Sequence, residues 1–279
     1  MIESFDAARL QRLYPAPAEP AALTGLYLRH ALHRRSQPCV YANFIASLDG
    51  RVALADRQGA LARMPSAILN PRDWQLYQEL VAQADVVLVG AGYLNYRSRQ
   101  TQGVVTLLDS ARDGSLRAWR AQEGLSPEPA LAVVSRELAL SEELVRAVQP
   151  QPLYIVTSRR APAARINALE RAGAQVLFAG DTRGVAGAIL IEALRAANFM
   201  RICSVAGPRV LHLLLKDDCL DRLYLTTGLR LLGGCTYATL VEGSLLPGAP
   251  AFNLEALYFD SPVSESAGQL FGVYTRERH

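Results

Sequence analysis

Residues 201–232 read RICSVAGPRVLHLLLKDDCLDRLYLTTGLRLL and hold a strand–helix–strand unit. An apolar run ends at Gly207, and Pro208 follows at the first position of a helix, where proline is favoured. The apolar residues up to Leu215 predict that helix, and residues 221–232 predict a second strand. Two strands joined through a helix pair in parallel, so this stretch predicts an α/β fold.

The same alternation extends back to residue 39. Short runs rich in Val, Ile and Leu predict further strands at 39–47, 84–90, 130–135, 152–158 and 174–180. Amphipathic segments between them predict helices at 72–83, 161–172 and 182–198. The tail predicts two strands, 255–261 and 268–276, joined by a polar turn. We therefore expect a mostly parallel central sheet flanked by helices, with a C-terminal β-hairpin.

The first 37 residues have a different texture. Two helices are predicted, over 3–13 and 22–34, with a proline-rich break at 15–20. No repeat or low-complexity linker interrupts the remainder. We expect an N-terminal helical extension, 1–37, followed by one domain, 38–279, which is close to the upper size of a single domain.

Composition excludes several classes of protein. The net charge is only +3 over 279 residues, and 28 of the 29 basic residues are Arg, so no concentrated basic face for nucleic acid is indicated. No apolar run approaches the length of a membrane span, and the N-terminus lacks a signal-peptide pattern. The four cysteines lack the spacing of a zinc site. We expect a cytoplasmic protein with no metal, membrane or nucleic-acid partner.

Ligands of open α/β sheets bind at the carboxyl ends of the strands, so the residues there are the candidates for a site. Gly207-Pro208 starts a helix, and its free backbone amides would suit a phosphate at Gly207, Pro208, Arg209, Val210 and Leu211. An ordinary strand-to-helix turn explains the same residues.

Ser158-Arg159-Arg160 follows another predicted strand. One hydroxyl and two guanidinium groups could clamp a terminal phosphate, such as the 2′-phosphate of NADPH. In a chain so rich in arginine, a solvated turn is the competing interpretation.

Gly90-Ala91-Gly92 also follows a strand, and Asp109 lies at about the distance that a dinucleotide fingerprint requires. The third glycine of that fingerprint is absent, because Asn95 stands there. A plain Rossmann dehydrogenase is therefore disfavoured, although Gly90 and Gly92 still permit close approach of a ligand.

Asp49 follows the first strand in the sequence Ser-Leu-Asp-Gly, which is also a common turn sequence. The four histidines match no nucleophile motif, and His212 on an apolar helix is typical of packing.

Three segments together resemble the reductase domain of riboflavin biosynthesis, the C-terminal part of the bifunctional deaminase–reductase. They are FIASLDGRVAL (44–54), ADVVLVGAGYL (84–94) and SVAGPRVLHLLLKDDCLDRLYLTTGLRLLGG (204–234). The similarity covers about 39–240, and the zinc motif of the deaminase is absent.

The resemblance implies a dihydrofolate-reductase-like fold, a homodimer, and NADPH as hydride donor to a pyrimidine ribosylamine phosphate. It places cofactor contacts at Ala46, Asp49, Tyr93, Ser158 and the segment 207–213. Asp49 would be the polar group nearest the nicotinamide, relaying a proton if burial raises its pKa, and Tyr93 is an alternative donor. The apolar tail strands also favour a dimer.

The substrate side departs from the family pattern. Val205 replaces a glutamate that contacts substrate, and Arg97 replaces an aspartate of an acidic loop, with Arg99 close by. These three residues are candidates for substrate binding, and the arginines would favour an anionic group. We therefore expect the family's pyrimidine intermediate to be a poor substrate.

Two functions remain open. The first is an NADPH-dependent reductase of a small pyrimidine-like or pterin-like heterocycle. The second is a nucleotide-binding protein on the same fold that has lost reductase turnover.

Overall fold

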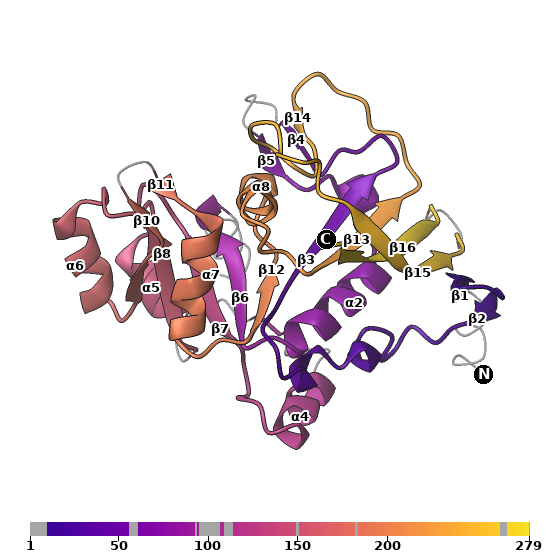
Figure 1. The fold of residues 1–279 in the computed structure, drawn as a ribbon, viewed down its shortest axis with the longest axis horizontal. Coiled ribbons are helices and arrows are strands. Elements are labelled where there is room, and N and C mark those ends of the chain that lie inside the picture. The colour runs from indigo at the N-terminus through magenta and orange to yellow at the C-terminus, as the bar shows by residue number, and fades with distance from the viewer. Residues whose placement is uncertain are drawn as a thin grey trace.

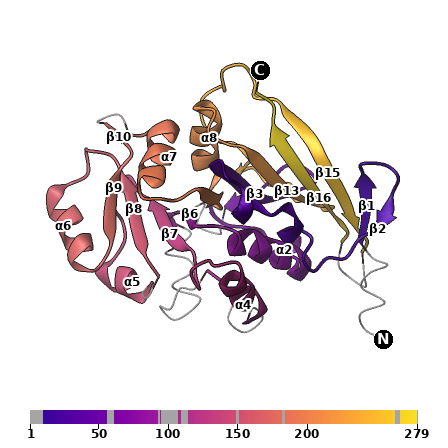
Figure 2. The same ribbon diagram turned by 60° about the horizontal axis from the view of Figure 1, so that its bottom comes forward.

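The computed structural model describes residues 10–55, 61–92, 94, 107–108, 114–148, 151–181, 184–262 and 267–278. A twisted sheet runs through the molecule, and helices cover both of its faces (Figures 1 and 2). Its strand order is β2-β1-β15-β16-β13-β3-β12-β6-β7-β8-β9.

Seven neighbouring strands are parallel and form the central sheet. They are β13 (Arg222–Gly228), β3 (Cys39–Ser47), β12 (Arg201–Ser204), β6 (Val86–Gly90), β7 (Ala130–Val134), β8 (Leu153–Thr157) and β9 (Gln175–Phe178). All seven match predicted strands within a few residues at either end. The apolar runs of β6 and β7 are uninterrupted, because both faces of the sheet are buried there.

Helices divide the core into two layers. α2 (Pro71–Ala82), α4 (Gly114–Gln122), α5 (Glu142–Ala147) and α6 (Ala163–Arg171) cover one face, and α7 (Gly187–Ala196) and α8 (Pro208–Lys216) cover the other. The strands alternate accordingly: in β12, Ile202 packs with α7 and α8, and Cys203 packs with α2. Among the described residues, no helix is both long and apolar enough to cross a membrane.

Local signals explain where α2 and α8 begin. The Asn70 side chain accepts a hydrogen bond from the Arg72 amide at 2.9 Å, and Pro71 occupies the first turn of α2. α8 has Gly207 at its cap position and Pro208 in its first turn. The predicted starts of both helices are therefore confirmed.

The C-terminal β-hairpin is also confirmed. β15 (Phe252–Asp260) and β16 (Gln269–Arg276) pair in antiparallel fashion, and β16 adds antiparallel to β13. Tyr258 and Phe271 are paired across the hairpin and buried on the α2 side of the sheet.

The predicted N-terminal helices are not observed. Residues Leu10–Tyr14 form β1, which pairs with the free edge of β15 and carries β2 (Glu19–Pro20), whereas residues before 10 lie outside the described part. Pairing with an open sheet edge outweighs local helix propensity.

Residues 22–34 form no α-helix but turns and two short 3₁₀ helices, η1 (Leu28–His30) and η2 (Leu32–Arg34). The carboxylate of Glu79 on α2 accepts hydrogen bonds from the amides of Gly25, Tyr27 and Leu28, at 2.5, 2.8 and 3.4 Å. These amides are thereby bound to a distant side chain instead of to helical carbonyl groups. The division of the chain at residue 37 stays a prediction.

A small second sheet stands beyond the end of β3. It has the order β14-β4-β5, formed by β14 (Tyr237–Ala238), β4 (Ala53–Ala55) and β5 (Leu61–Arg63). These strands are too short for a periodic pattern, and no strand was predicted there.

Candidate functional site

The site lies where the chain order of the parallel sheet reverses. β12 follows β9 in sequence, yet it is inserted between β3 and β6, with Ser204 paired to both Ala42 and Leu88. Neighbouring parallel strands that lead away in opposite directions leave a crevice at their carboxyl ends, where ligands bind. The ends of β3, β12 and β6 therefore define the centre of the candidate site.

The start of α8 lies at this edge of the sheet, because α8 directly follows β12. Gly207 has no side chain to cap the helix, no acidic residue occupies the first turn, and a Cβ built on Gly207 would meet nothing within 4 Å. The predicted residues Val210 and Leu211 are buried in the core, and their amides donate to the Gly207 carbonyl at 2.9 and 3.2 Å. An uncapped helix start with open space before it suits an anionic group.

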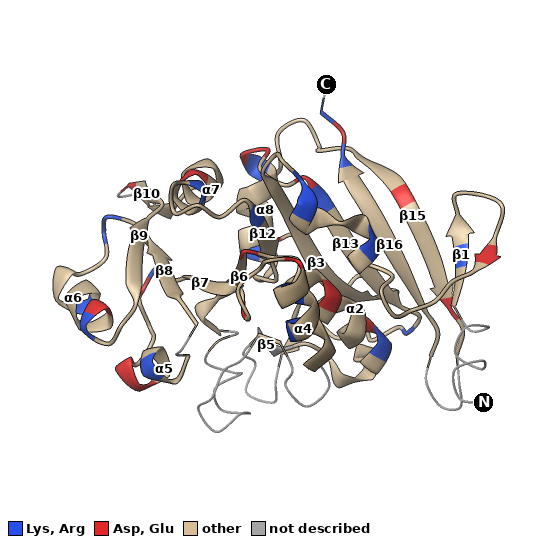
Figure 3. Ribbon diagram, turned by 90° about the horizontal axis from the view of Figure 1, so that it is seen from below, with Lys and Arg blue, Asp and Glu red and all other residues tan. Residues whose placement is uncertain are grey.

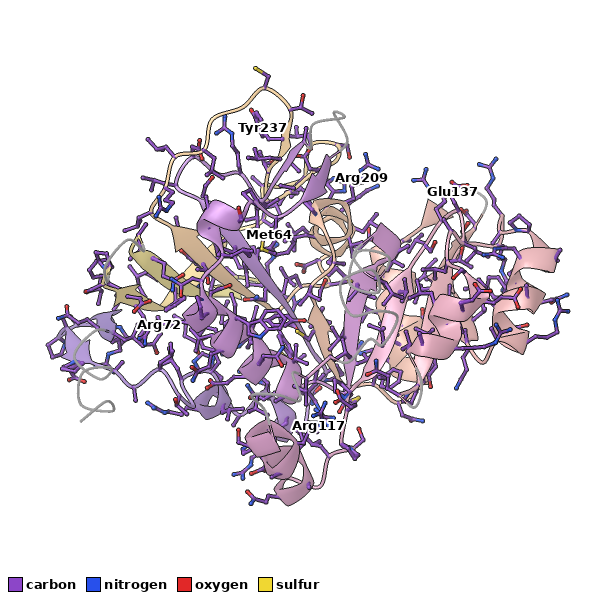
Figure 4. The ribbon with its side chains drawn as sticks, turned by 180° about the vertical axis from the view of Figure 1, so that it is seen from behind. Met64, Arg72, Arg117, Glu137, Arg209 and Tyr237 are labelled. Atoms are coloured by element: carbon purple, nitrogen blue, oxygen red, sulfur yellow. The ribbon has the colours of Figure 1, made fainter. Side chains whose placement is uncertain are left out.

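Ala46 and Gly90 lie at the same edge. Ala46 is buried near the end of β3, and Gly90 ends β6 with nothing within 4 Å of its Cβ position. In Figure 4, Arg209 at the start of α8 lies between Tyr237 of the small sheet and Glu137 beyond β7. The structure thus brings Ala46, Gly90 and the start of α8 together.

A second group of polar residues follows β7 and β8. Ser158 is buried after β8, and Arg159 and Arg160 are exposed beside it. The structure adds Ser135 and Arg136 at the end of β7, where the Ser135 amide donates to the Val156 carbonyl at 3.0 Å. A Ser-Arg pair follows both of these predicted strands, at 135–136 and at 158–159, and this repetition in the sequence could have indicated Ser135 and Arg136 as candidates. Basic and acidic residues are otherwise interspersed over the ribbon (Figure 3).

The carboxylate of Asp49 interacts with four neighbouring groups. Ser47 donates its hydroxyl hydrogen to one carboxylate oxygen, and the Leu232 and Gly233 amides donate to the other, at 3.1 and 2.9 Å. Arg51 Nη1 lies 2.6 Å from that second oxygen. The hydrogen bonds from Ser47 and Gly233 are the two largest causes that lower the pKa of Asp49, which is about 2. The expectation that burial raises this pKa, so that Asp49 relays a proton, is wrong.

Asp49 instead ties the end of β3 to the small sheet. Arg51 also donates to the Gly234 carbonyl at 3.4 Å and lies 4.4 Å from the ring centre of Tyr237 on β14. Sequence reasoning missed this role, because residues 232–234 are distant in the chain.

We expect Asp49→Asn to weaken the dependence of the free energy of unfolding on pH in the acid range. A carboxylate with a lowered folded pKa stabilises the fold above its unfolded pKa, near 4, and loses this contribution as the pH falls toward 2. Denaturant unfolding between pH 2 and 7 would measure it, with Glu137→Gln on an exposed residue as control. An equal dependence on pH in the acid range for the Asp49→Asn and unmutated chains would contradict this role.

The structure adds an acidic residue that the sequence did not indicate. Asp73 in the first turn of α2 is hydrogen-bonded to Thr226, which is buried on β13. Burial raises the pKa of Asp73 to about 6, against the opposing effect of the Thr226 hydrogen bond. Asp73 as a whole residue is half-buried. Acidic residues are common in the first turn of a helix, because they interact favourably with the helix dipole. For this reason Asp73 did not stand out in the sequence as a candidate for the site.

The remaining candidates divide into placed and unplaced residues. Val205 follows β12 and packs against the α2-side core, as Trp74 does. Gly92 follows β6 and is exposed. Tyr93, Arg97, Arg99 and Asp109 lie outside the described residues, and their roles stay predictions. His212 packs against Gly243 and contacts the Ser244 carbonyl at 2.8 Å, as a packing residue would. Within the described ranges, no group of three or more His, Cys, Asp or Glu could hold a metal ion.

Comparison with known proteins places the chain in a family. The sequence pattern of the RibD C-terminal domain matches residues 38–259. No curated protein sequence matches significantly.

Solved structures share the fold at low sequence identity. A pyrimidine reductase-like protein from Corynebacterium diphtheriae is 21% identical with a TM-score of 0.65, over 87% of this chain and 93% of that one. The riboflavin biosynthesis reductase of Saccharomyces cerevisiae is 16% identical with a TM-score of 0.57, over 91% of this chain and 99% of that one. Acinetobacter baumannii RibD is 15% identical with a TM-score of 0.59, over 86% of this chain but only 58% of that one. The chain therefore belongs to the RibD C-terminal domain family and shares its fold with these solved reductase structures.

Proposed function

We propose that the protein is an NADPH-dependent reductase of a small pyrimidine-like or pterin-like heterocycle. One observation carries the proposal: the half-buried acid Asp73 and the uncapped start of α8 share the carboxyl edge of the central sheet. A reductase needs an anion-binding element for its dinucleotide and a proton source for its substrate. The family supports the same reaction class.

The residues at this edge fit a nicotinamide dinucleotide. The open space before Gly90 and Gly207 allows phosphate groups to approach the backbone, and the start of α8 offers its positive end. Ser158, Arg159 and Arg160 would hold the 2′-phosphate. When bound, the cofactor supplies a hydride to the substrate.

Asp73 would supply the matching proton. Because the pKa of Asp73 is raised, a fraction of the molecules keeps this carboxyl group protonated near neutral pH. The hydrogen bond to Thr226 fixes the orientation of the carboxyl group. Loss of the proton leaves a carboxylate that Thr226 still stabilises through its hydroxyl group. Asp49, with its lowered pKa, is assigned to holding the turn after β3, and its contact with the cofactor remains a prediction. Tyr93 remains a predicted site residue.

The substrate would differ from the pyrimidine intermediate of the family. Val205 offers no acceptor for an exocyclic amine, whereas Arg97 and Arg99 remain predicted contacts for an anionic group. Oxidation of NADPH, followed by absorbance with a panel of pterins and pyrimidines, tests the function. Turnover of any member supports a reductase, whereas NADPH binding without turnover favours the alternative, a nucleotide-binding protein.

We expect NADPH to bind more tightly than NADH. Exchanging both Arg159 and Arg160 for Ala should weaken NADPH binding by about 1–3 kcal/mol, because charge-assisted hydrogen bonds to the 2′-phosphate are lost. NADH binding should change little. Fluorescence titration with both cofactors measures this, and an equal loss for the two would remove the pair from phosphate recognition.

We also propose a homodimer. Leu257, Phe259 and Leu270 lie on the face of the hairpin opposite to buried Tyr258 and Phe271, and they are only half-buried. A second copy could cover this apolar face. Sedimentation at micromolar concentration should give the mass of a dimer, and a monomer would contradict the proposal.

A further inference from the structure

Three arginines follow β7 and β8, namely Arg136, Arg159 and Arg160, and they differ in the contacts of their side chains. The guanidinium carbon of Arg159 lies 5.3 Å from the ring centre of Phe178, the last residue of β9. The Arg159 amide also donates to the Gly180 carbonyl at 3.4 Å. Neither Arg136 nor Arg160 has a hydrogen bond, ion pair or ring contact within the described part of the chain. Arg159 is therefore the best-held guanidinium of the three.

The partners of Arg159 lie at the edge of the sheet, in β9 and the residues that follow it. Phe178 pairs with Thr157 across β8 and β9, and the residue is 38% exposed. Gly180 begins the short pair β10 (Gly180–Asp181) and β11 (Gly184–Val185), and a Cβ built on it would lie 1.8 Å from the Gly184 carbonyl oxygen. Phe178 therefore keeps an exposed part at the edge strand β9, where the guanidinium of Arg159 contacts its ring.

We propose that Arg159 determines the preference for a 2′-phosphate and that Phe178 is its positioning residue. This inference rests on the cofactor choice of the proposed function and separates two arginines that the sequence treats as a pair. A guanidinium held on an aromatic face loses fewer rotamers on binding, so more of its interaction with phosphate appears as affinity. Arg160 must be ordered from solvent, and its attraction is screened by salt.

Binding of 2′,5′-ADP and 5′-AMP tests the inference without any substrate. The two probes differ by the 2′-phosphate, so the ratio of their dissociation constants isolates its recognition. Calorimetry at 0.15 M salt would compare the unmutated chain with Arg159→Ala, Arg160→Ala, Phe178→Leu and Phe178→Tyr. Unchanged affinity for 5′-AMP shows that a variant is folded.

We expect the unmutated chain to favour 2′,5′-ADP and Arg159→Ala to lower this preference about 10-fold or more, the usual effect of losing a charge-assisted hydrogen bond. Arg160→Ala should lower it less than about threefold, as expected for a solvent-exposed charge. Phe178→Leu should lower the preference for 2′,5′-ADP about three- to tenfold, the range of a cation–π contact of about 1 kcal/mol. Phe178→Tyr keeps an aromatic ring and should leave this preference unchanged.

A preference that survives Arg159→Ala, or equal losses in Arg159→Ala and Arg160→Ala, would overturn the role of Arg159. A preference unaffected by Phe178→Leu would overturn the role of Phe178. An unmutated chain that binds both probes equally would instead contradict the cofactor choice of the proposed function, and the inference would fall with it.

Discussion

Asp73→Asn should lower kcat by about 10²–10⁴-fold, the usual contribution of a positioned general acid. Asparagine keeps the shape of the side chain and can still bond to Thr226, but it has no proton to transfer. Binding of NADPH should be unchanged, because Asp73 lies on α2 and the proposed phosphate contacts lie on α8 and after β8. Steady-state kinetics with an active heterocycle, alongside cofactor titration, measures both quantities.

The pH profile gives a sharper test of the same role. With a pKa of about 6, Asp73 is protonated below pH 6, so kcat should fall as the pH rises through that value. Thr226→Val removes the hydrogen bond that lowers the pKa, and the fall should move to higher pH. A profile that Asp73→Asn leaves unchanged would exclude Asp73 as the acid.

Stability provides a control for these variants. The folded pKa of Asp73 is raised, so the folded chain loses stability as the pH rises from the unfolded pKa, near 4, through about 6. Asp73→Asn lacks this loss and should be more stable than the unmutated chain at pH 8. Greater stability with lower activity would separate a functional acid from a structural one.

Glu79→Leu should lower the free energy of unfolding by about 1–3 kcal/mol, the cost of leaving a buried hydrogen-bond donor without its acceptor. The carboxylate accepts hydrogen bonds from three backbone amides of residues 25–28, and leucine has a similar volume but no acceptor. The segment 23–34 should then detach from α2. Denaturant unfolding, combined with proteolysis of that segment, measures both effects.

Gln75→Leu on the same helix is the matched control. Its side chain bonds to Thr24 at 3.0 Å in an exposed position, so its loss should cost less than about 1 kcal/mol. Similar losses for the two variants would show that the segment is held by its apolar contacts, among them buried Leu26 and Leu32, and not by Glu79.

Several elements could be predicted because their determinants are local. The apolar run of β3 is bounded at both ends, and Asn70-Pro71 marks the start of α2. The Gly-Pro step before α8 likewise combines a strand end with a helix start. The N-terminal segment was misjudged because its structure comes from the edge of β15 and from Glu79, neither of which its own residues reveal.

The candidate site shows the same division. The residues at the strand ends could be named from sequence, since every parallel strand ends at the same edge of the sheet. Asp73 could not, because its unusual pKa depends on burial beside Thr226, which lies 153 positions further along the chain. The raised pKa expected for Asp49 was wrong for a related reason: residues 232 and 233 supply amides that lower it.

The sequence by itself determined the class of the fold, the parallel strands and the start of α8, because periodicity, caps and glycine–proline steps act over a few neighbouring residues. Only the tertiary structure decided that β12 enters between β3 and β6, that Asp49 is a bound carboxylate and Asp73 a protonatable one, and that Phe178 holds Arg159. The pKa of a carboxyl group and the freedom of a guanidinium depend on the groups packed around them, and packing joins residues that are far apart in the chain.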